Sequence, residues 1–345
     1  MATKLMADPR IDPRIKAVMG GWPDLPPVPD AKDRAQLLAE VGTPEAKARA
    51  EAQRAMLAAM DSEEIAPSTG LTIRTETFTS EPDGNQINIQ FIRPEGEAVV
   101  PCVYYIHGGG MQSMSAFDGL YTAWGKIIAA QGMVAVAMVD FRNCLQASSA
   151  PQVDPFPAGL NDCVSGLKWV AANHAQLGID PARIIVAGES GGGNLTLAVG
   201  LKLKRDGELG LIKGLYALCP YIAGKWPQDA YPSSSENNGI LLDLHNNRGA
   251  LAYGIEELNA RNPLAWPAFA TEDDVKGFPY TVISVNECDP LRDEGIAFYR
   301  LLLKAGVPAR CRQAMGTIHG TEIFAICCPD VSRDAARDIA SVARG

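Results

Sequence analysis

The sequence lacks the patterns that mark several specialised classes of protein. No stretch approaches the run of about 18 apolar residues that a membrane-spanning helix needs, so we expect no stable membrane insertion. The N-terminal stretch MATKLMADPRIDPRIK holds no apolar segment of the kind found in secretory signals, and we therefore expect a cytoplasmic protein. Neither a G-x-G-x-x-G fingerprint nor a P-loop is present, which excludes the two commonest nucleotide-binding motifs.

Charge and cysteine usage argue against two further kinds of partner. The formal net charge is −9, and no basic stripe is available to hold phosphates, so we expect no nucleic-acid partner. The eight cysteines form no CxxC pair, and several lie inside apolar runs. This favours buried free thiols over disulfides or a zinc site. A chain of 345 residues with 47% hydrophobic residues can bury one large core.

Short apolar runs alternate with helical stretches from about residue 71 onward. The segments LTIRTETF and NQINIQFI are separated by turn residues at 82–85 and predict a pair of antiparallel strands. Later apolar runs alternate with helices, which predicts an α/β fold whose mostly parallel sheet carries helices on both faces. These strands are predicted at 101–106, 133–139, 183–187, 212–218, 280–285 and 308–312, and the helices at 117–131, 157–173, 191–205 and 293–305.

Two segments depart from this alternation. Residues up to about 30 are rich in Pro and Asp and predict an irregular arm, followed by helices at 31–41 and 44–60. Residues 220–267 show no strand pattern, and an insertion of this length usually has a function. We therefore predict an N-terminal helical arm (1–65) that forms part of a cap, an α/β domain (66–219 and 268–345) and a cap insertion (220–267).

The motif that carries most chemical information is Gly188-Glu189-Ser190-Gly191-Gly192. It follows the strand pattern RIIVAG and precedes the helical pattern GGNLTLAVGLKLKR. A G-x-S-x-G motif between a strand and a helix is typical of a nucleophile elbow, in which a strained turn exposes the serine hydroxyl. We therefore predict Ser190 as a nucleophile.

A second motif, His107-Gly108-Gly109-Gly110, directly follows the strand CVYYI. Glycines at the end of a strand expose backbone N–H groups that can converge on an oxyanion. We predict Gly108 and Gly109 as two donors and Gly191, at the start of the next helix, as the third.

A serine nucleophile needs a base, and the chain has four histidines. His107 belongs to the glycine loop, His174 lies near a predicted helix end, and His245 lies in the insertion. His319 lies in the loop MGTIHGTE after the last predicted strand, where a triad of the order Ser, acid, His has its histidine. We predict His319 as the base.

The acid of such a triad lies between the serine and the histidine. The segment YTVISVNECDPLRDEG offers Glu287, Asp289, Asp293 and Glu294. Asp293 and Glu294 fall at the start of a predicted helix, where their effect on the helix dipole explains them. Asp289 follows the strand and is our prediction, with Glu287 as the alternative.

Taken together, these motifs resemble the hormone-sensitive-lipase family of serine esterases. The resemblance rests on HGGG at 107–110, GESGGGN at 188–194, DPLRDEG at 289–295 and HG at 319–320. It implies an eight-stranded α/β-hydrolase sheet with a helical cap, no metal and no organic cofactor, and it supports Asp289 as the acid. The chain departs from the family in having Glu189 and Gly191 where Asp and Ala are common, and Phe141 in place of a common Tyr.

The expected function is hydrolysis of small-molecule carboxylic esters, with short acyl groups preferred and lactones as further substrates. The alternative is a non-catalytic protein that binds a small molecule on the same fold. Bulky side chains of the cap are expected to enclose the pocket, and a homodimer is left open. The predicted substrate-binding residues are Met111, Glu189, Trp226 and Tyr231.

Overall fold

The computed structural model describes residues 3–24 and 26–345 and contains an eight-stranded sheet of order β1-β2-β4-β3-β5-β6-β7-β8. β2 pairs antiparallel with both β1 and β4, whereas the later neighbouring pairs are parallel. The predicted eight-stranded, mostly parallel sheet is therefore confirmed. The strands are β1 (Leu71–Thr79), β2 (Gln86–Pro94), β3 (Val100–Ile106), β4 (Ala135–Val139), β5 (Ile179–Glu189), β6 (Gly214–Leu218), β7 (Tyr280–Cys288) and β8 (Ala309–Ile318).

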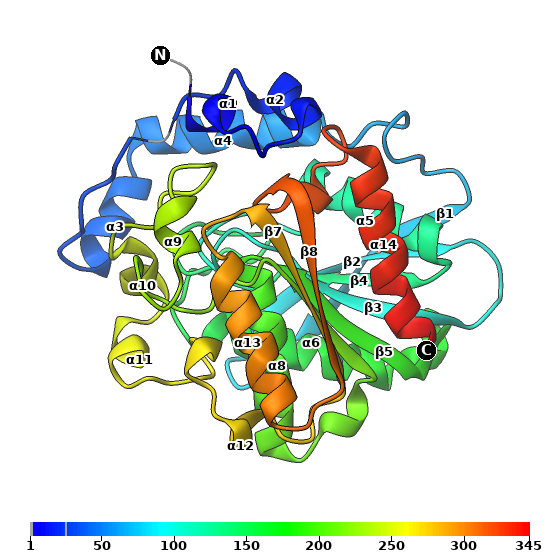
Figure 1. Ribbon diagram of the computed structural model, residues 1–345. Helices are drawn as coiled ribbons and strands as arrows, with labels where there is room; N and C mark the ends of the chain where they lie inside the picture. The colour runs from blue at the N-terminus through cyan, green and yellow to red at the C-terminus, as the bar shows by residue number, and fades with distance from the viewer. Residues whose placement is uncertain (1–2, 25) are drawn as a thin grey trace.

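Helices cover both faces of the sheet (Figure 1). Side chains of β3 alternate between the faces, so that Tyr104 packs in one hydrophobic cluster and Tyr105 in the other. Helices α6, α8 and α13 contribute to the first cluster, and α5 and α14 to the second. These helices are α5 (Gly119–Gly132), α6 (Ala158–Ala172), α8 (Gly191–Asp206), α13 (Arg292–Lys304) and α14 (Pro329–Arg344).

Helix α14 was not predicted from the sequence. It is strongly amphipathic, and its buried face consists mainly of small residues such as Ala336 and Ala340. Ala340 lies against Gly132 at the end of α5, where a larger side chain would not fit. The two helices therefore pack closely over one face of the sheet.

The first 19 residues contain two short helices, which corrects the predicted irregular arm there, whereas residues 20–24 and 26–30 are irregular as predicted. α1 (Lys4–Ala7) follows Thr3, whose hydroxyl accepts a hydrogen bond from the backbone of Met6. α2 (Pro13–Met19) has Asp12 as its N-cap and a proline at its first position. The next helices, α3 (Arg34–Val41) and α4 (Pro44–Ala58), agree with the prediction.

The N-terminal helices lie across the carboxyl ends of β7 and β8 (Figure 1). Leu5, Ile15 and Met19 are buried with Ile240 of the insertion and Ile318 of β8 in a small hydrophobic cluster. The arm is therefore fixed to the insertion and to the end of the sheet. This is the end at which a parallel sheet places its ligand-binding loops.

The insertion at 220–267 contains only short helices joined by loops. They are α9 (Ser233–Glu236), α10 (Arg248–Tyr253) and α11 (Ile255–Asn259). The remaining short elements are α7 (His174–Leu177), α12 (Glu272–Val275) and the 3-10 turns Leu209–Leu211, Pro267–Phe269 and Thr321–Ile323.

All eight cysteines are free thiols, seven of them buried and Cys311 half-buried, as predicted. Within the described ranges, the structure contains no helix with the length and apolar character that crossing a membrane requires.

Candidate active site

Ser190 occupies the sharp turn between β5 and α8. Its φ and ψ are 56° and −118°, a strained conformation for a residue with a side chain. The turn is held from the neighbouring strand, because Ser190 N donates to Leu218 O at 3.0 Å and Ser190 O accepts from Tyr221 N at 3.0 Å. A Cβ at Gly192 would overlap the carbonyl oxygen of Ile106, so this position of the elbow requires glycine.

Asp289 and His319 come from the loops that follow β7 and β8, and the structure brings them together. Asp289 Oδ2 lies 2.8 Å from His319 Nδ1, and the carboxyl is completely buried. The second oxygen, Oδ1, accepts the backbone N–H of Leu291 at 2.9 Å. Burial opposes the imidazolium, but the Asp289 carboxylate outweighs it and raises the pKa of His319 well above its ordinary value.

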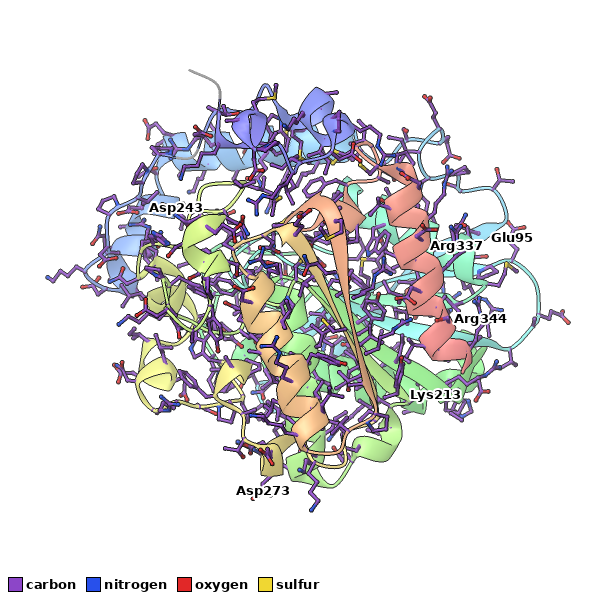
Figure 2. The ribbon with its side chains drawn as sticks, viewed as in Figure 1. Glu95, Lys213, Asp243, Asp273, Arg337 and Arg344 are labelled. Atoms are coloured by element: carbon purple, nitrogen blue, oxygen red, sulfur yellow. The ribbon has the colours of Figure 1, made fainter. Side chains whose placement is uncertain are left out.

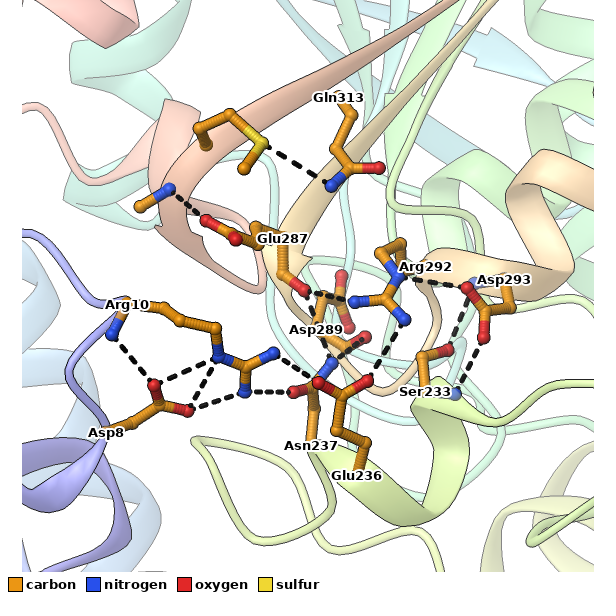
Figure 3. Close-up of polar contacts among 12 residues, drawn as sticks. Asp8, Arg10, Ser233, Glu236, Asn237, Glu287, Asp289, Arg292, Asp293 and Gln313 are labelled. Atoms are coloured by element: carbon orange, nitrogen blue, oxygen red, sulfur yellow. Dashed lines mark hydrogen bonds and ion pairs between the residues drawn. The ribbon is translucent and has the colours of Figure 1, made fainter.

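The alternative acid, Glu287, does not face His319. Its Oε2 accepts the backbone N–H of Gly316 at 2.7 Å (Figure 3). Glu287 thus connects β7 to the bend in β8, and Asp289 is the carboxyl in contact with the imidazole.

A polar network fixes the Asp289 loop to the insertion and to the N-terminal arm (Figure 3). Asn237 is buried, and its Nδ2 donates to the carbonyl oxygens of Asp289 at 3.1 Å and Glu287 at 3.3 Å. Its Oδ1 accepts from Arg10 at 2.9 Å. Arg10 and Arg292 both bind Glu236 of α9. The backbone around Asp289 is therefore held by residues distant in sequence that the motifs did not indicate.

The glycine loop differs from the prediction at one donor. The N–H of Gly108 donates to the Tyr121 hydroxyl at 2.9 Å and is not available to a substrate, which corrects its assignment. Gly109 and Gly110 line the cavity beside Ser190 instead. No acceptor within residues 3–24 and 26–345 engages their N–H groups. Gly191 lies against Gly110, since a Cβ on Gly191 would be 2.8 Å from Gly110 N.

Ser190 and His319 line a common cavity of about 660 Å³. The N-terminal arm and the insertion form much of its wall. Their contributions are Trp22, Val28, Gln53, Met56 and Leu57 from the arm, and Tyr221, Leu241, Leu242, Asp243, Leu244, Asn246, Arg248 and Gly249 from the insertion. Figure 2 shows Asp243 beneath the N-terminal segment, where its carboxylate accepts the backbone N–H of Val28 at 3.3 Å.

Of the predicted substrate-binding residues, Met111, Trp226 and Tyr231 do not line this cavity. Trp226 instead donates from Nε1 to Glu294 Oε2 at 2.6 Å and stacks on Tyr221. It is thus a structural residue of the insertion, and these three assignments are corrected.

Glu189 does line the cavity, but both of its carboxylate oxygens are engaged inside the protein. Burial raises the pKa of Glu189 to about 7, although hydrogen bonds from Tyr105 and Tyr121 oppose this rise. Because both oxygens are hydrogen-bonded to tyrosines of the protein, neither is favoured as a direct contact to the substrate.

Cys219 is a neighbour of the histidine that sequence reasoning missed. Its sulfur, a ring nitrogen of His319 and a carboxylate oxygen of Asp289 all lie within 4.8 Å of one another. Burial raises the pKa of Cys219 to about 11, so that it remains a protonated thiol and is not a competing nucleophile at neutral pH. Its position directly after the apolar strand LYAL was the available signal.

Two of the remaining histidines, His107 and His245, have structural contacts. His107 is completely buried and stacks on Phe141, with ring centroids 4.3 Å apart. His245 Nε2 lies 2.8 Å from Ser234 O within the insertion. Of the four histidines, His319 is the one that lines the cavity with Ser190.

A family model described as the α/β-hydrolase fold matches residues 103–323, more than half of the chain. The chain belongs to the α/β-hydrolase family. Carboxylesterase NlhH of Mycobacterium tuberculosis is 33% identical over 249 residues, which cover 71% of this chain and 74% of that protein. This α/β-hydrolase is therefore similar in sequence to a named carboxylesterase.

Solved structures extend the likeness to nearly the whole chain. Esterase Est22 is 65% identical, with a TM-score of 0.97 over 100% of both chains. Brefeldin A esterase, described as a bacterial homologue of human hormone-sensitive lipase, is 37% identical, with a TM-score of 0.85 over 98% of this chain and 94% of that one. The chain is thus a carboxylic ester hydrolase similar to hormone-sensitive lipase. The predicted family, fold class and enzyme class are confirmed, in preference to a non-catalytic binding protein.

Proposed function

We propose that this enzyme hydrolyses carboxylic esters through an acyl-enzyme intermediate formed on Ser190. His319 removes the proton of the Ser190 hydroxyl as its oxygen attacks the ester carbonyl. His319 then protonates the departing alcohol, and a water molecule, activated by the same imidazole, hydrolyses the acyl-enzyme. Asp289 holds the proton on Nδ1 and stabilises the imidazolium that forms in both half-reactions.

The negative charge that develops on the carbonyl oxygen needs nearby donors. We assign this role to the backbone N–H groups of Gly109, Gly110 and Gly191. The support is that Gly109 and Gly110 line the cavity and that Gly110 lies against Gly191, which follows the nucleophile. Such preorganised donors are typically the largest electrostatic contribution to acyl transfer.

The observation that carries this proposal is the buried pairing of Asp289 with His319 at 2.8 Å beside a cavity that also exposes Ser190. A carboxylate held at Nδ1 leaves Nε2 as the basic nitrogen, the arrangement that a serine nucleophile requires. The strained backbone of Ser190 supports the same assignment.

The proposed substrates are esters with a short acyl group of about two to six carbons and a larger alcohol portion. Lactones are proposed as further substrates. A cavity of about 660 Å³ has the size of an ordinary small-molecule site. Its apolar wall includes Leu57 of the arm and Leu241 and Leu244 of the insertion. We propose that residues 1–65 and 220–267 together act as the cap that limits substrate length.

Ester hydrolysis by the wild type and a Ser190→Ala variant tests the mechanism. A structure of Est22 contains p-nitrophenol, so we choose p-nitrophenyl esters as assay substrates for the present enzyme. We expect Ser190→Ala to lower kcat by roughly 10⁶. Ser341→Ala, on the exposed side of α14, serves as the matched control and should retain full activity. A folded Ser190→Ala protein with substantial activity would contradict the assignment.

A further inference from the structure

A buried cluster of three side chains lies directly beside the nucleophile. Glu189 immediately precedes Ser190, and its Oε1 accepts a hydrogen bond from the Tyr121 hydroxyl at 2.6 Å. Its Oε2 accepts from the Tyr105 hydroxyl, also at 2.6 Å. Glu189, Tyr105 and Tyr121 are each no more than 2% exposed. Burying a carboxylate raises the free energy of the folded protein unless the carboxylate is hydrogen-bonded. The two tyrosine hydroxyls therefore stabilise Glu189 in this position.

Tyr121 connects the cluster to the glycine loop. Its hydroxyl oxygen accepts the backbone N–H of Gly108 at 2.9 Å while its proton is donated to Glu189. A hydroxyl that donates to a carboxylate becomes a better acceptor, so the two hydrogen bonds strengthen each other. The connection therefore runs from the residue before the nucleophile, through α5, to the first glycine after His107.

The position of Gly108 makes this contact relevant to catalysis. Gly108 directly precedes Gly109 and Gly110, which line the cavity. A Cβ on Gly108 would overlap Oε1 of Glu189, so the loop lies against the carboxylate without intervening space. The remaining donor, Gly191, follows Ser190 on the same elbow that carries Glu189. Glu189 thus links the two chain segments that supply the donors.

We propose that Glu189 and Tyr121 are positioning residues that hold the glycine loop over Ser190 and thereby preorganise the oxyanion hole. This inference rests on the oxyanion hole proposed above. Donors that are fixed before the reaction need no reorganisation when charge develops on the substrate oxygen. Loosening the loop should therefore weaken binding of the transition state more than binding of the ester.

Tyr105 provides a matched control inside the same cluster. Its hydroxyl donates to the same carboxylate over the same distance and is equally buried, but it extends from β3 and makes no hydrogen bond to the glycine loop. Replacement of either tyrosine by phenylalanine removes one hydroxyl from Glu189. Only Tyr121→Phe also removes the acceptor of Gly108 N–H.

The test compares Tyr121→Phe with Tyr105→Phe in kcat, KM, melting temperature and affinity for a trifluoromethyl ketone, which forms a tetrahedral adduct with the serine. We expect Tyr121→Phe to lower kcat by roughly 10- to 100-fold, less than the 10²–10³ typical for loss of an oxyanion donor itself, because the donors remain. The ketone should bind more weakly by a similar factor, with KM within about threefold of wild type. Tyr105→Phe should keep kcat within about threefold at a similar loss of melting temperature.

Equal losses of kcat in the two variants, or an unchanged kcat in Tyr121→Phe, would overturn the proposal. If Tyr121→Phe does not fold, Glu189→Gln serves instead, since one carbonyl oxygen cannot replace two carboxylate acceptors. We then expect a lower kcat with KM retained, and an unchanged kcat would again overturn the proposal. Labelling of Ser190 by an organophosphonate is measured in parallel, because its absence in the wild type would refute the serine mechanism rather than the role of Tyr121.

Discussion

Asp289→Asn is the substitution whose effect follows most directly from the hydrogen bonds of the site. It preserves the size of the side chain but replaces one acceptor oxygen by a donor NH₂ group. The amide oxygen is expected to remain at Leu291 N–H, because an NH₂ group there would place two donors against each other. The NH₂ group must then face Nδ1 of His319, where the carboxylate oxygen now lies at 2.8 Å.

A donor at Nδ1 makes this nitrogen an acceptor and moves the imidazole proton to Nε2. The base then points its N–H rather than its lone pair toward Ser190, and it cannot accept the serine proton. We expect kcat to fall by about 10⁴. Such a loss corresponds to about 5.5 kcal/mol of transition-state stabilisation at 1.36 kcal/mol per tenfold.

Glu287→Gln is the matched control, measured by ester hydrolysis under the same conditions with circular dichroism to verify folding. The glutamine oxygen can still accept Gly316 N–H, so we expect kcat within about threefold of wild type. A larger loss in Glu287→Gln than in Asp289→Asn would refute the assignment of Asp289 as the acid. Nearly full activity in Asp289→Asn would refute the tautomer argument.

Further predictions concern the network around the acid, the pH profile and the cavity. Asn237→Ala removes one hydrogen bond from each of two carbonyl oxygens, Glu287 O and Asp289 O, which Arg292 still engages. The loss of these two hydrogen bonds should lower the free energy of unfolding in urea by about 1–3 kcal/mol. Arg10→Ala should lower kcat more than Arg14→Ala, because Arg14 pairs with Asp12 and Asp330 and does not contact Asn237. The base must be neutral and the pKa of His319 is raised, so kcat/KM should fall as pH decreases, with a midpoint above about 6.5 in the wild type. The midpoint should be lower in Asp289→Asn, and a pH-independent rate would contradict a titrating base. With one fixed alcohol, kcat/KM should be greatest at acyl lengths of about two to six carbons; a rate that still increases at about twelve carbons would contradict a closed cap.

The strand, turn and helix around Ser190 could be predicted because their geometry is local. The elbow around Ser190 needs a strand, a strained turn and a helix in immediate succession, and all three are visible in the residues around GESGG. The position of His319 followed from chain order after the last strand. These predictions required no knowledge of contacts between distant segments, and the structure brings Asp289, His319 and Ser190 to one end of the sheet.

The same information could not show which N–H groups of the glycine loop are engaged inside the protein. Gly108 and Gly109 are equivalent in sequence pattern, and Tyr121, the side chain that occupies Gly108 N–H, lies on another element. Its pairing with Glu189 joins residues 68 positions apart. No periodicity reports such a contact, so the motif indicated the loop but not the free N–H groups.

Residues of the insertion at 220–267 were predicted least well because their contacts are long-range. Trp226 suggested a pocket wall, but the buried Glu294 carboxylate binds its indole. The aliphatic residues that do line the cavity belong to the run GILLDL at 239–244, an apolar segment inside a polar insertion that could have been noticed. The arm helices likewise had readable caps at Thr3 and Asp12.

Labelling by a fluorophosphonate that mimics a short-chain ester tests the central claim most directly. The intact protein should gain one phosphonyl group per chain with complete loss of activity, and peptide mapping should place it on Ser190. His319→Ala should slow the labelling strongly while leaving the protein folded, since the hydroxyl then has no base. Modification of a different residue with loss of activity, or full activity after stoichiometric labelling of Ser190, would contradict the account.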